Sequence, residues 1–551
     1  PAVGSGVVER RDLTHPLVPT LAAAGIGIAY LIAAPETADM AAHTYRTWLW
    51  DEVGFATWNA QWYGGHHMAG YSLLYPPLAA LAGTRLVGVV AGVAAVGLFA
   101  VLARRRAPTP AAGALAAWLF LGGVMSNVVI GRMPFTLGIA LAVGAWACAR
   151  RSLPAAAVLS LASVFASPVA GVFLAVAAVA TLAGDFESPA KRRIALSLGA
   201  PAVVGGLAMY ALFPEGGADH FTATAFWPML LICLGALALV DPSRRTALWA
   251  SALYVAILVG AFAFPNSLGQ NALRPGVVIG PALLVLFARP RAPRAAIAVV
   301  AVALVYLQWL PAVRAVEEAR GDPSTQATFH AEVLRFLDDR AAPGERVEVP
   351  LTKNHWEASY LAESYPLARG WHRQLDRKVN PLFYDAQQPL TAAAYEEWLH
   401  DNAVRWVALP AAPLDFSAGA ERDLLERGLP FLEPVHESPN WRIWEVRDAL
   451  PPVEGPAELV AAGADGFDLE ASGTGDVLVR QHGTPYWEVV AGDACVSEDP
   501  SGWTTVRVRR PGLISVRARF SAVGALRREP RCADGDAPVR TSAVNPPVTG
   551  K

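Results

Sequence analysis

Long apolar stretches alternate with short polar connections over the first 310 residues of the chain. A helix needs roughly 20 apolar residues to cross about 30 Å of hydrocarbon without leaving backbone groups unpaired. About eleven stretches meet or nearly meet that length, and they cover residues 17–34, 78–103, 111–130, 135–149, 154–166, 168–183, 194–213, 225–240, 246–264, 276–288 and 295–310. The pattern predicts a polytopic α-helical membrane domain over residues 17–313, in which residues 17–34 are a retained first helix and not a signal peptide.

Arginine and lysine gather in every second connection. The clusters fall at residues 10–11, 104–106, 150–151, 191–193, 244–245 and 289–294. Because cytoplasmic loops carry the excess of basic residues, we expect these connections and the N-terminal residues 1–16 on the cytoplasmic side. The alternation requires two short helices that meet at Pro168, a residue that breaks helices. The loop 35–77 is then outside, and an odd number of crossings places the C-terminal part outside as well.

Beyond residue 313 the spacing of apolar residues is that of a soluble protein. Helical spacing over 329–337 and 395–402 alternates with short apolar strands at 346–350, 404–409 and 441–446, which predicts an extracytoplasmic α/β domain over residues 314–449. From residue 450 onward, short strands with Gly and Pro between them predict a small β-sandwich-like module over residues 450–532. Its expected strands are 477–480, 486–490, 504–509 and 513–520. Residues 533–551 are expected to form a disordered tail.

Composition supports the membrane assignment. The 551 residues are 54% hydrophobic and only 17% charged, which is too apolar for a soluble protein of this length. The basic clusters lie between apolar stretches, so they indicate topology and not a nucleic-acid surface. Two of the four cysteines, Cys148 and Cys233, fall inside predicted helices. Cys495 and Cys532 flank the β-rich module on the oxidising side, where a disulfide would stabilise the module by roughly 4 kcal/mol; two unpaired thiols are the alternative.

The outer loop 35–77 holds the first candidate chemistry. Asp39 and His43 are spaced four residues apart, so both side chains project from one face if the segment is helical. Asp39 could act as the general base for an acceptor hydroxyl, and His43 could orient that carboxylate or contact a phosphate. The alternative is that Asp39 caps an interfacial helix over residues 38–50.

Two more acids follow at the end of this helical pattern. Asp51 and Glu52 could bind a divalent cation, Mg or Mn, together with Asp39, because hard cations prefer carboxylates. Adjacent acids that are simply solvated are the alternative.

A turn rich in glycine and aromatic residues completes the loop. His66 and His67 have no second ligand pair at a zinc spacing, which leaves contact with a sugar or phosphate, or an interfacial turn. Trp58, Trp62 and Tyr63 could stack on sugar rings. Aromatic residues also populate membrane interfaces without any ligand.

Two arginines break the rule that outer loops lack basic residues. Arg132 follows a predicted helix, and Arg274 lies in an outer loop that also carries amides such as Asn271. A guanidinium at the hydrocarbon edge could hold a lipid-linked phosphate, with Asn271 beside it. Snorkelling to anionic head groups is the alternative. In the soluble part, the segment 371–381 mixes aromatic, basic and amide groups and could line an acceptor cleft.

The order Asp39-x-x-x-His43, then Trp58 with Trp62-Tyr63-Gly64-Gly65, then Tyr75-Pro76-Pro77-Leu78 resembles the first outer loop of a family of bacterial membrane proteins. These polytopic proteins are named as related to 6-pyruvoyl-tetrahydropterin synthase and are similar to the GT-C superfamily of membrane glycosyltransferases. The name does not imply pterin chemistry.

The resemblance implies a multi-pass enzyme of the bacterial plasma membrane that moves a sugar from a polyprenyl-phosphate donor to a cell-envelope glycan or lipid acceptor. It also implies that the acidic residue after the first helix is the base, and Asp39 matches that position. The second outer loop has only Arg132 where better-known members carry an acidic pair, which leaves metal dependence and the donor open.

The leading hypothesis from the sequence is therefore inverting glycosyl transfer. A transporter or lipid flippase with an extracytoplasmic binding domain is the alternative, but no inverted repeat and no acidic residues in the middle of the predicted helices support it. A non-catalytic scaffold that binds cell-wall polymer is a third possibility.

Overall fold

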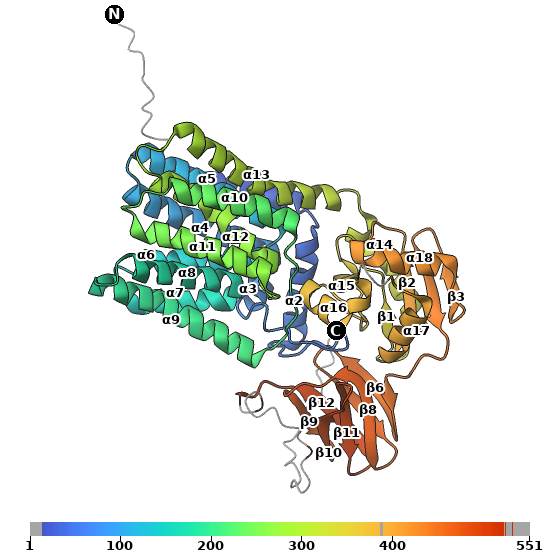
Figure 1. The fold of residues 1–551 in the computed structure, drawn as a ribbon. Helices are drawn as coiled ribbons and strands as arrows, with labels where there is room; N and C mark the ends of the chain where they lie inside the picture. Colours follow the sequence, from blue (N-terminus) through green and yellow to red (C-terminus); the bar gives the residue numbers. More distant parts are fainter. Residues whose placement is uncertain (1–13, 386–388, 523, 525–531, 533–551) are drawn as a thin grey trace, which may run out of the picture. The chain divides into compact units, whose positions relative to one another are not determined.

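The computed structural model describes residues 14–385, 389–522, 524 and 532. The predicted tail 533–551 lies outside the described residues, as does most of the predicted N-terminal segment 1–16. Two compact units are present (Figure 1). The helical unit consists of Pro1–Asp51, Gly70–Thr325 and Trp371–Val379, and the mixed unit consists of Glu52–Ala69, Gln326–Gly370 and Asn380–Lys551. The predicted boundaries at residues 313 and 449 stay predictions.

The helices of the helical unit follow the apolar pattern closely. They are α1 (Leu17–Ala33), α2 (Ala38–Val53), α3 (Tyr75–Ala82), α4 (Thr84–Arg106), α5 (Pro110–Ile130), α6 (Met133–Cys148), α7 (Leu153–Ala166), α8 (Pro168–Gly184), α9 (Pro189–Leu212), α10 (Ala223–Leu239), α11 (Arg245–Ala263), α12 (Leu273–Phe287), α13 (Arg294–Ala319) and the short α16 (Arg373–Val379). Ten of the eleven predicted apolar stretches each form one helix, whereas the stretch 78–103 is divided at Gly83 between α3 and α4. The break before Pro168 lies where it was predicted.

Six helices among the described residues are long and apolar enough to cross a membrane. The bent pair α1 and α2, which meet at 80°, would raise that number to seven if the pair forms one span. Large apolar side chains stay exposed on these helices, for example Ile32 at 81% and Val302 at 67%, as expected of surfaces that face lipid. Because α6, α7, α8 and α10 have only 14 to 17 residues, the prediction of eleven crossings stays a prediction.

Close packing of α5 against α12 determines which helix ends meet. A Cβ atom on Gly123 would lie 2.6 Å from backbone atoms of Val278, so only glycine lets the two helices approach this closely. Gly123 lies two turns before the end of α5, and Val278 lies soon after the start of α12. The turn that carries Arg132, directly after α5, is therefore brought to the same end of the unit as Arg274 in the first turn of α12.

The first part of the mixed unit is a small α/β fold. Its sheet has the order β1-β2-β4-β3, in which β1 pairs parallel with β2 and the other pairs are antiparallel. The elements are α14 (Ala327–Asp338), β1 (Arg346–Glu348), α15 (Glu357–Tyr360), α17 (Ala392–Asp401), β2 (Val404–Pro410), α18 (Gly419–Arg427), β3 (Leu432–Glu437) and β4 (Trp441–Val446). Buried residues such as Tyr395, Leu399 and Val407 form the core. The three predicted strands are present, and β3 is an additional one.

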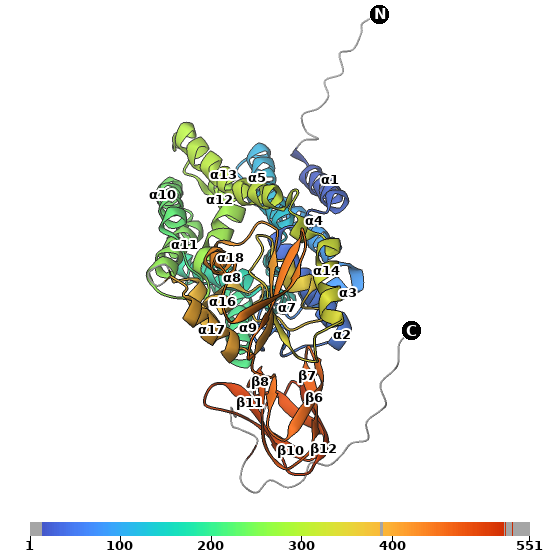
Figure 2. The ribbon, with the colours of Figure 1, turned by 90° about the vertical axis from the view of Figure 1, so that its right-hand side faces the viewer.

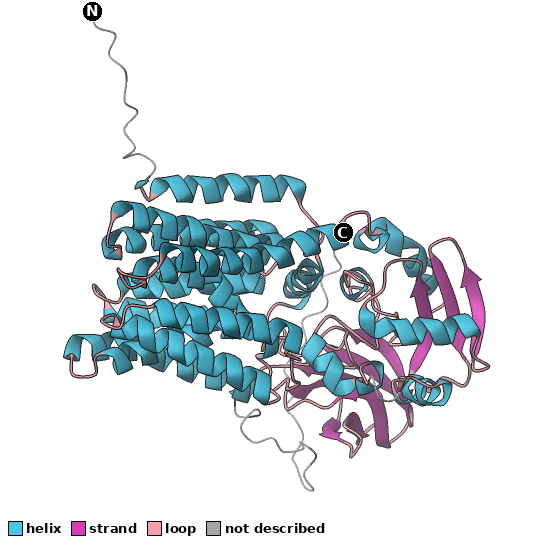
Figure 3. Cartoon of the chain, turned by 45° about the horizontal axis from the view of Figure 1, so that its top comes forward, coloured by secondary structure: helices cyan, strands magenta, loops and turns pink. Residues whose placement is uncertain are grey.

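The second part of the mixed unit has two four-stranded antiparallel sheets, as expected of a β-sandwich-like module (Figures 2 and 3). Their orders are β10-β11-β8-β5 and β6-β7-β12-β9. The strands are β5 (Val453–Glu454), β6 (Ala457–Gly463), β7 (Gly466–Ala471), β8 (Gly475–His482), β9 (Trp487–Ala491), β10 (Ala494–Glu498), β11 (Trp503–Val508) and β12 (Gly512–Ala518). The prediction missed β5, β6, β7 and β10.

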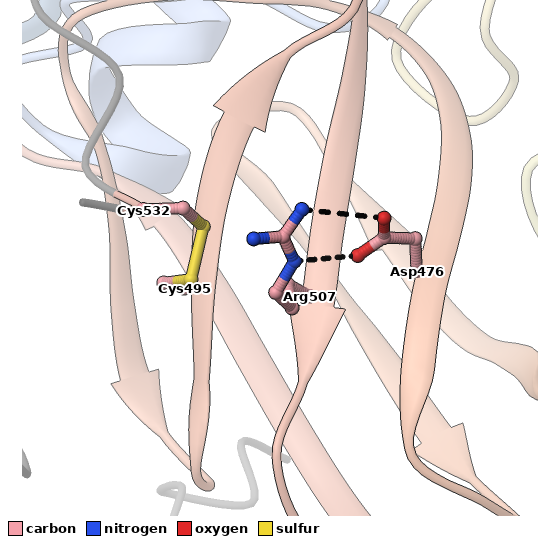
Figure 4. Close-up of a disulfide and its surroundings, with 4 residues drawn as sticks. All are labelled: Asp476, Cys495, Arg507 and Cys532. Carbon is pink, nitrogen blue, oxygen red and sulfur yellow. Dashed lines mark hydrogen bonds and ion pairs between the residues drawn. A yellow bond between two sulfur atoms is a disulfide. The ribbon is translucent and has the colours of Figure 1, made fainter. Parts of the chain in front are cut away.

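The predicted disulfide between Cys495 and Cys532 is present, with the two Cα atoms 5.3 Å apart (Figure 4). It joins β10 to the chain beyond β12. On the neighbouring strands, Arg507 and Asp476 form a cross-strand ion pair at 2.8 Å. The disulfide therefore closes the C-terminal end of the module onto its sheet.

Candidate functional site

The corner between α1 and α2 is held by an arginine. α1 ends at Ala34 in a left-handed conformation with φ 39°, and the guanidinium of Arg85 donates to the carbonyls of Ala34 and Pro35, each at 3.3 Å. The same group pairs with Glu36 at 2.7 Å. Carbonyls at a helix C-terminus lack partners within the helix and carry partial negative charge. Arg85 therefore stabilises the end of α1 and the direction in which the chain enters α2.

A second anchor holds the start of α2 against the turn between α5 and α6. The hydroxyl of Thr37 donates to the carbonyl of Ile130 at 2.7 Å. Gly131 has a φ of 95°, and a Cβ atom there would lie 2.9 Å from Cγ of Met40 and 3.0 Å from Oγ1 of Thr37. Glycine is required at this position both for the backbone conformation and for the close approach. The anchor brings the first turn of α2 next to Arg132.

Asp39 lies in that first turn and forms an ion pair with Arg132, with Oδ2 and Nε 3.4 Å apart. Both side chains keep some exposure, 30% for Asp39 and 24% for Arg132. The pKa of the Arg132 guanidinium is lowered to about 10, first by burial and then by the charge of Arg274, while Asp39 acts in the opposite direction. Arg132 is thus paired with Asp39, and the guanidinium of Arg274 lies nearby, 5.4 Å from the centroid of the Phe135 ring in the first turn of α6.

A shallow pocket with almost no free volume lies beside α2, one helical turn after Asp39. Its lining residues are His43, Arg46, Tyr71, Ser72, Tyr75, Pro76 and Pro134.

The imidazole of His43 is only 2% exposed, and neither of its ring nitrogens has a hydrogen-bond partner among the described residues. It lies between the rings of Tyr71 and Tyr75, at centroid distances of 5.6 and 5.9 Å. The guanidinium of Arg46 lies over the Tyr71 ring, 4.0 Å from its centroid. A buried imidazole without a partner is costly unless a ligand or water meets it. Because α2 is a continuous helix from Ala38 to Val53, Asp39 and His43 are one turn apart, as the spacing predicted for a helical segment.

Asp219, which the sequence analysis did not single out, holds the segment that carries Arg274. Its carboxylate accepts hydrogen bonds from the backbone of Gln270 at 3.1 Å and from the Asn271 amide at 3.4 Å. Burial raises the pKa of Asp219, against the hydrogen bond from Gln270 and the charges of Arg274 and Arg377. Its only sequence signal was an acid in the connection between α9 and α10. The predicted binding residues Asn271 and Arg274 are thus fixed by a residue from another loop.

The remaining histidine and aromatic candidates belong to the mixed unit, where they have their own packing. Trp62 is fully buried, donates its indole N–H to the Ala358 carbonyl at 3.0 Å and stacks on His66. Trp58, Tyr63 and His67 are also buried, at 5%, 2% and 8% exposure. Their surroundings are those of core residues, so their contact with sugar stays a prediction.

The acidic residues predicted to share a cation are far apart along α2. α2 is continuous from Ala38 to Val53, so Asp39 and Asp51 are separated by about 18 Å at the helical rise of 1.5 Å per residue. Asp51 and Glu52 are both exposed. One ion cannot bind all three carboxylates in this arrangement, because ligand distances are about 2–2.6 Å. Metal dependence in general stays a prediction.

No protein-family model and no curated protein matches the chain. Among solved structures, the chain is similar to the arabinofuranosyltransferase AftD from Mycobacteria, determined by single-particle cryo-EM. That similarity has a TM-score of 0.43 at 12% sequence identity, and it covers 95% of this chain and 58% of the other. The chain therefore spans little more than half the length of that protein, and a similarity with so low a TM-score carries no argument about activity.

Proposed function

We propose that the protein is a membrane glycosyltransferase that moves a sugar from a polyprenyl-phosphate donor to a cell-envelope acceptor at the outer face of a bacterial plasma membrane. The observation that carries the proposal is the position of Asp39. Its carboxylate is held beside Arg132, at a point where the charge of Arg274 also acts. A carboxylate next to two cations supplies both the base and the anion site that this reaction needs.

In the proposed reaction, Asp39 takes the proton of an acceptor hydroxyl while the hydroxyl oxygen attacks the anomeric carbon of the donor. The bond between that carbon and the phosphate oxygen breaks, and polyprenyl phosphate leaves with the bonding electrons. Attack on the face opposite the leaving group inverts the anomeric centre. Arg132 and Arg274 stabilise the negative charge that develops on the leaving phosphate.

The surroundings of Asp39 support this assignment of roles. The buried His43 has two ring nitrogens that can bond to a donor phosphate or a sugar hydroxyl. The apolar helices of the same unit provide a membrane setting for a lipid-linked donor. No metal ion is part of the proposed step.

The test compares the wild-type protein with Asp39→Asn in lipid nanodiscs. The substrates are polyprenyl-phosphate-linked sugars with a radiolabelled sugar, offered with a cell-envelope extract as acceptor, and the measurement is the release of polyprenyl phosphate with transfer of the label. Removal of a general base lowers rates by about 10²–10⁴-fold. Asp51→Asn, on the same helix but exposed, is the matched control and keeps full activity.

Equal transfer by Asp39→Asn and the wild type would reject Asp39 as the base. Absence of transfer by the wild type with every labelled donor would reject the proposed glycosyltransferase activity. Movement of labelled lipid across the bilayer without transfer would instead favour the flippase alternative.

A further inference from the structure

A short segment from the C-terminal half of the chain belongs to the helical unit. Trp371–Val379, which contains α16, clusters with the helices, whereas Gly370 and Asn380 on either side belong to the mixed unit. Along the sequence, this segment of the helical unit interrupts the mixed unit, and we call it the strap. Figure 1 labels α16 within this segment.

The first contact of the strap reaches the residue next to Asp39. The indole N–H of Trp371 donates to the carbonyl of Ala38 at 2.7 Å. Ala38 is the first residue of α2, and its carbonyl also belongs to the first helical turn. The guanidinium of Arg373 lies 5.1 Å from the centroid of the Trp371 ring, within the range of a cation–π interaction. The indole therefore bonds to the backbone directly before the residue from which the Asp39 side chain projects.

Further contacts hold the strap to the connection between α9 and α10. His372 pairs with Glu215 at 3.6 Å and contacts the edge of the pocket residue Tyr71, with ring centroids 6.4 Å apart. The ammonium group of Lys378 donates to the Glu215 carbonyl at 3.0 Å. Gly217, at φ 84°, lies so close to the strap that a Cβ atom would be 2.2 Å from the carbonyl oxygen of Gln374. The strap is therefore docked along its length, and the indole bond to Ala38 is part of a fixed arrangement.

We propose that Trp371 is a positioning residue for Asp39, an inference that rests on the proposed function. Trp371 touches no reacting atom. It sets the direction of the first turn of α2 and with it the distance between the Asp39 carboxylate and the bound acceptor. Catalysis is sensitive to such placement, since a shift of about 1 Å can cost about 100-fold in rate. The C-terminal half of the chain thereby contributes directly to the active geometry.

The test is Trp371→Phe, which keeps an aromatic ring but removes the N–H donor. Trp444→Phe is the control, because Trp444 is a half-buried tryptophan on β4 in the mixed unit. Three quantities are measured in nanodiscs: kcat for transfer, the Kd for undecaprenyl phosphate, and the melting temperature. We expect Trp371→Phe to lower kcat by about 10–100-fold with the Kd and the melting temperature unchanged, and Trp444→Phe to leave all three unchanged.

Each other outcome overturns the inference in a recognisable way. An unchanged kcat in Trp371→Phe, with an active wild type, removes the positioning role and leaves the proposed function intact. A joint loss of kcat, lipid-phosphate binding and thermal stability shows a purely structural role for Trp371. An inactive wild type rejects the proposed function, and the positioning role with it.

Discussion

Asp39, in the first turn of α2, and Arg132, in the turn between α5 and α6, form an ion pair across 3.4 Å. Three structural features make this pair possible. They are the 80° bend between α1 and α2, the hydrogen bond from the Thr37 hydroxyl to the Ile130 carbonyl at the end of α5, and the glycine at position 131. Each of them positions an element and takes no part in the proposed chemistry. The ion pair thus results from the packing of these elements, and substitutions at the surrounding residues test its role.

Arg274→Gln should weaken binding of undecaprenyl phosphate by about 10–100-fold, because a hydrogen bond to a charged group contributes about 1.5–3 kcal/mol. The remaining affinity should depend less steeply on salt, since one cation fewer contacts the phosphate. Titration by microscale thermophoresis at two ionic strengths measures both effects. Arg314→Gln, at an exposed arginine of α13, is the control. Equal affinities for the two variants would exclude Arg274 from the phosphate site.

His43→Leu separates a functional role of this histidine from a structural one. The substitution removes a buried imidazole that has no hydrogen-bond partner in the described part of the chain, so the melting temperature should stay equal or rise. Transfer should nevertheless fall at least about tenfold, the loss expected when one hydrogen bond to a charged group is removed. Melting curves and transfer rates on the same preparation give both values. A stable variant with full activity would contradict a role for His43 in the site.

Gly131→Ala should destabilise the protein by at least about 1–2 kcal/mol, the cost of a left-handed conformation for a residue with a Cβ atom. The contact with Met40 and Thr37 adds to that cost and should also disturb the Asp39–Arg132 pair. Gly206→Ala is the control. Gly206 lies within α9 with open space at its Cβ position, so alanine there should stabilise the protein by about 0.5–1 kcal/mol. Thermal unfolding in detergent measures both, and equal melting temperatures would contradict the prediction.

Loss of the disulfide should destabilise the β-rich module. The double variant Cys495→Ser/Cys532→Ser opens a loop with a sequence separation of 37, which costs about 4 kcal/mol in the chain-entropy model. Limited proteolysis and melting curves with and without reductant measure the effect. Cys148→Ser, at a free cysteine of α6, should behave as the wild type. A wild-type protein insensitive to reductant would contradict the expectation.

Asp219→Asn should change the pH dependence of stability. Because burial raises the pKa of Asp219, the folded protein keeps its proton at pH values where the unfolded chain has released it. The stabilisation is full below the ordinary aspartate pKa of 3.8 and is lost as the pH rises through the raised value. Asparagine is neutral throughout, so the melting temperature of the variant relative to the wild type should rise from pH 4 to pH 7. An Asp51→Asn control should show no such trend, and a constant difference for Asp219→Asn would contradict the assignment.

Part of the fold could be predicted from local sequence alone. Apolar length predicted most helices of the bundle, because a helix that faces lipid must satisfy its backbone internally and cover itself with apolar side chains. It did not separate α3 from α4, and it did not predict the short α16. Pro168 predicted the break between α7 and α8, and the run from Val404 to Leu409 predicted β2. The strand β6 was missed because its exposed positions weaken the alternation that identifies a strand. The strand β7 does alternate, with Phe467 and Leu469 buried and Glu470 exposed, and was missed nevertheless.

Part of the candidate site could also be predicted from local sequence, and the rest depended on tertiary packing. The spacing of Asp39 and His43 placed both residues on one face of α2, since four residues make about one helical turn. Their different environments were not predictable: Asp39 is partly exposed beside Arg132, whereas His43 is buried between two tyrosines. Arg274, Asp219 and Trp371 come from segments far apart in the chain. Periodicity describes one element at a time, so only tertiary packing, through contacts such as Gly123 with Val278 and Trp371 with Ala38, decided which helix ends and which strap meet at Asp39.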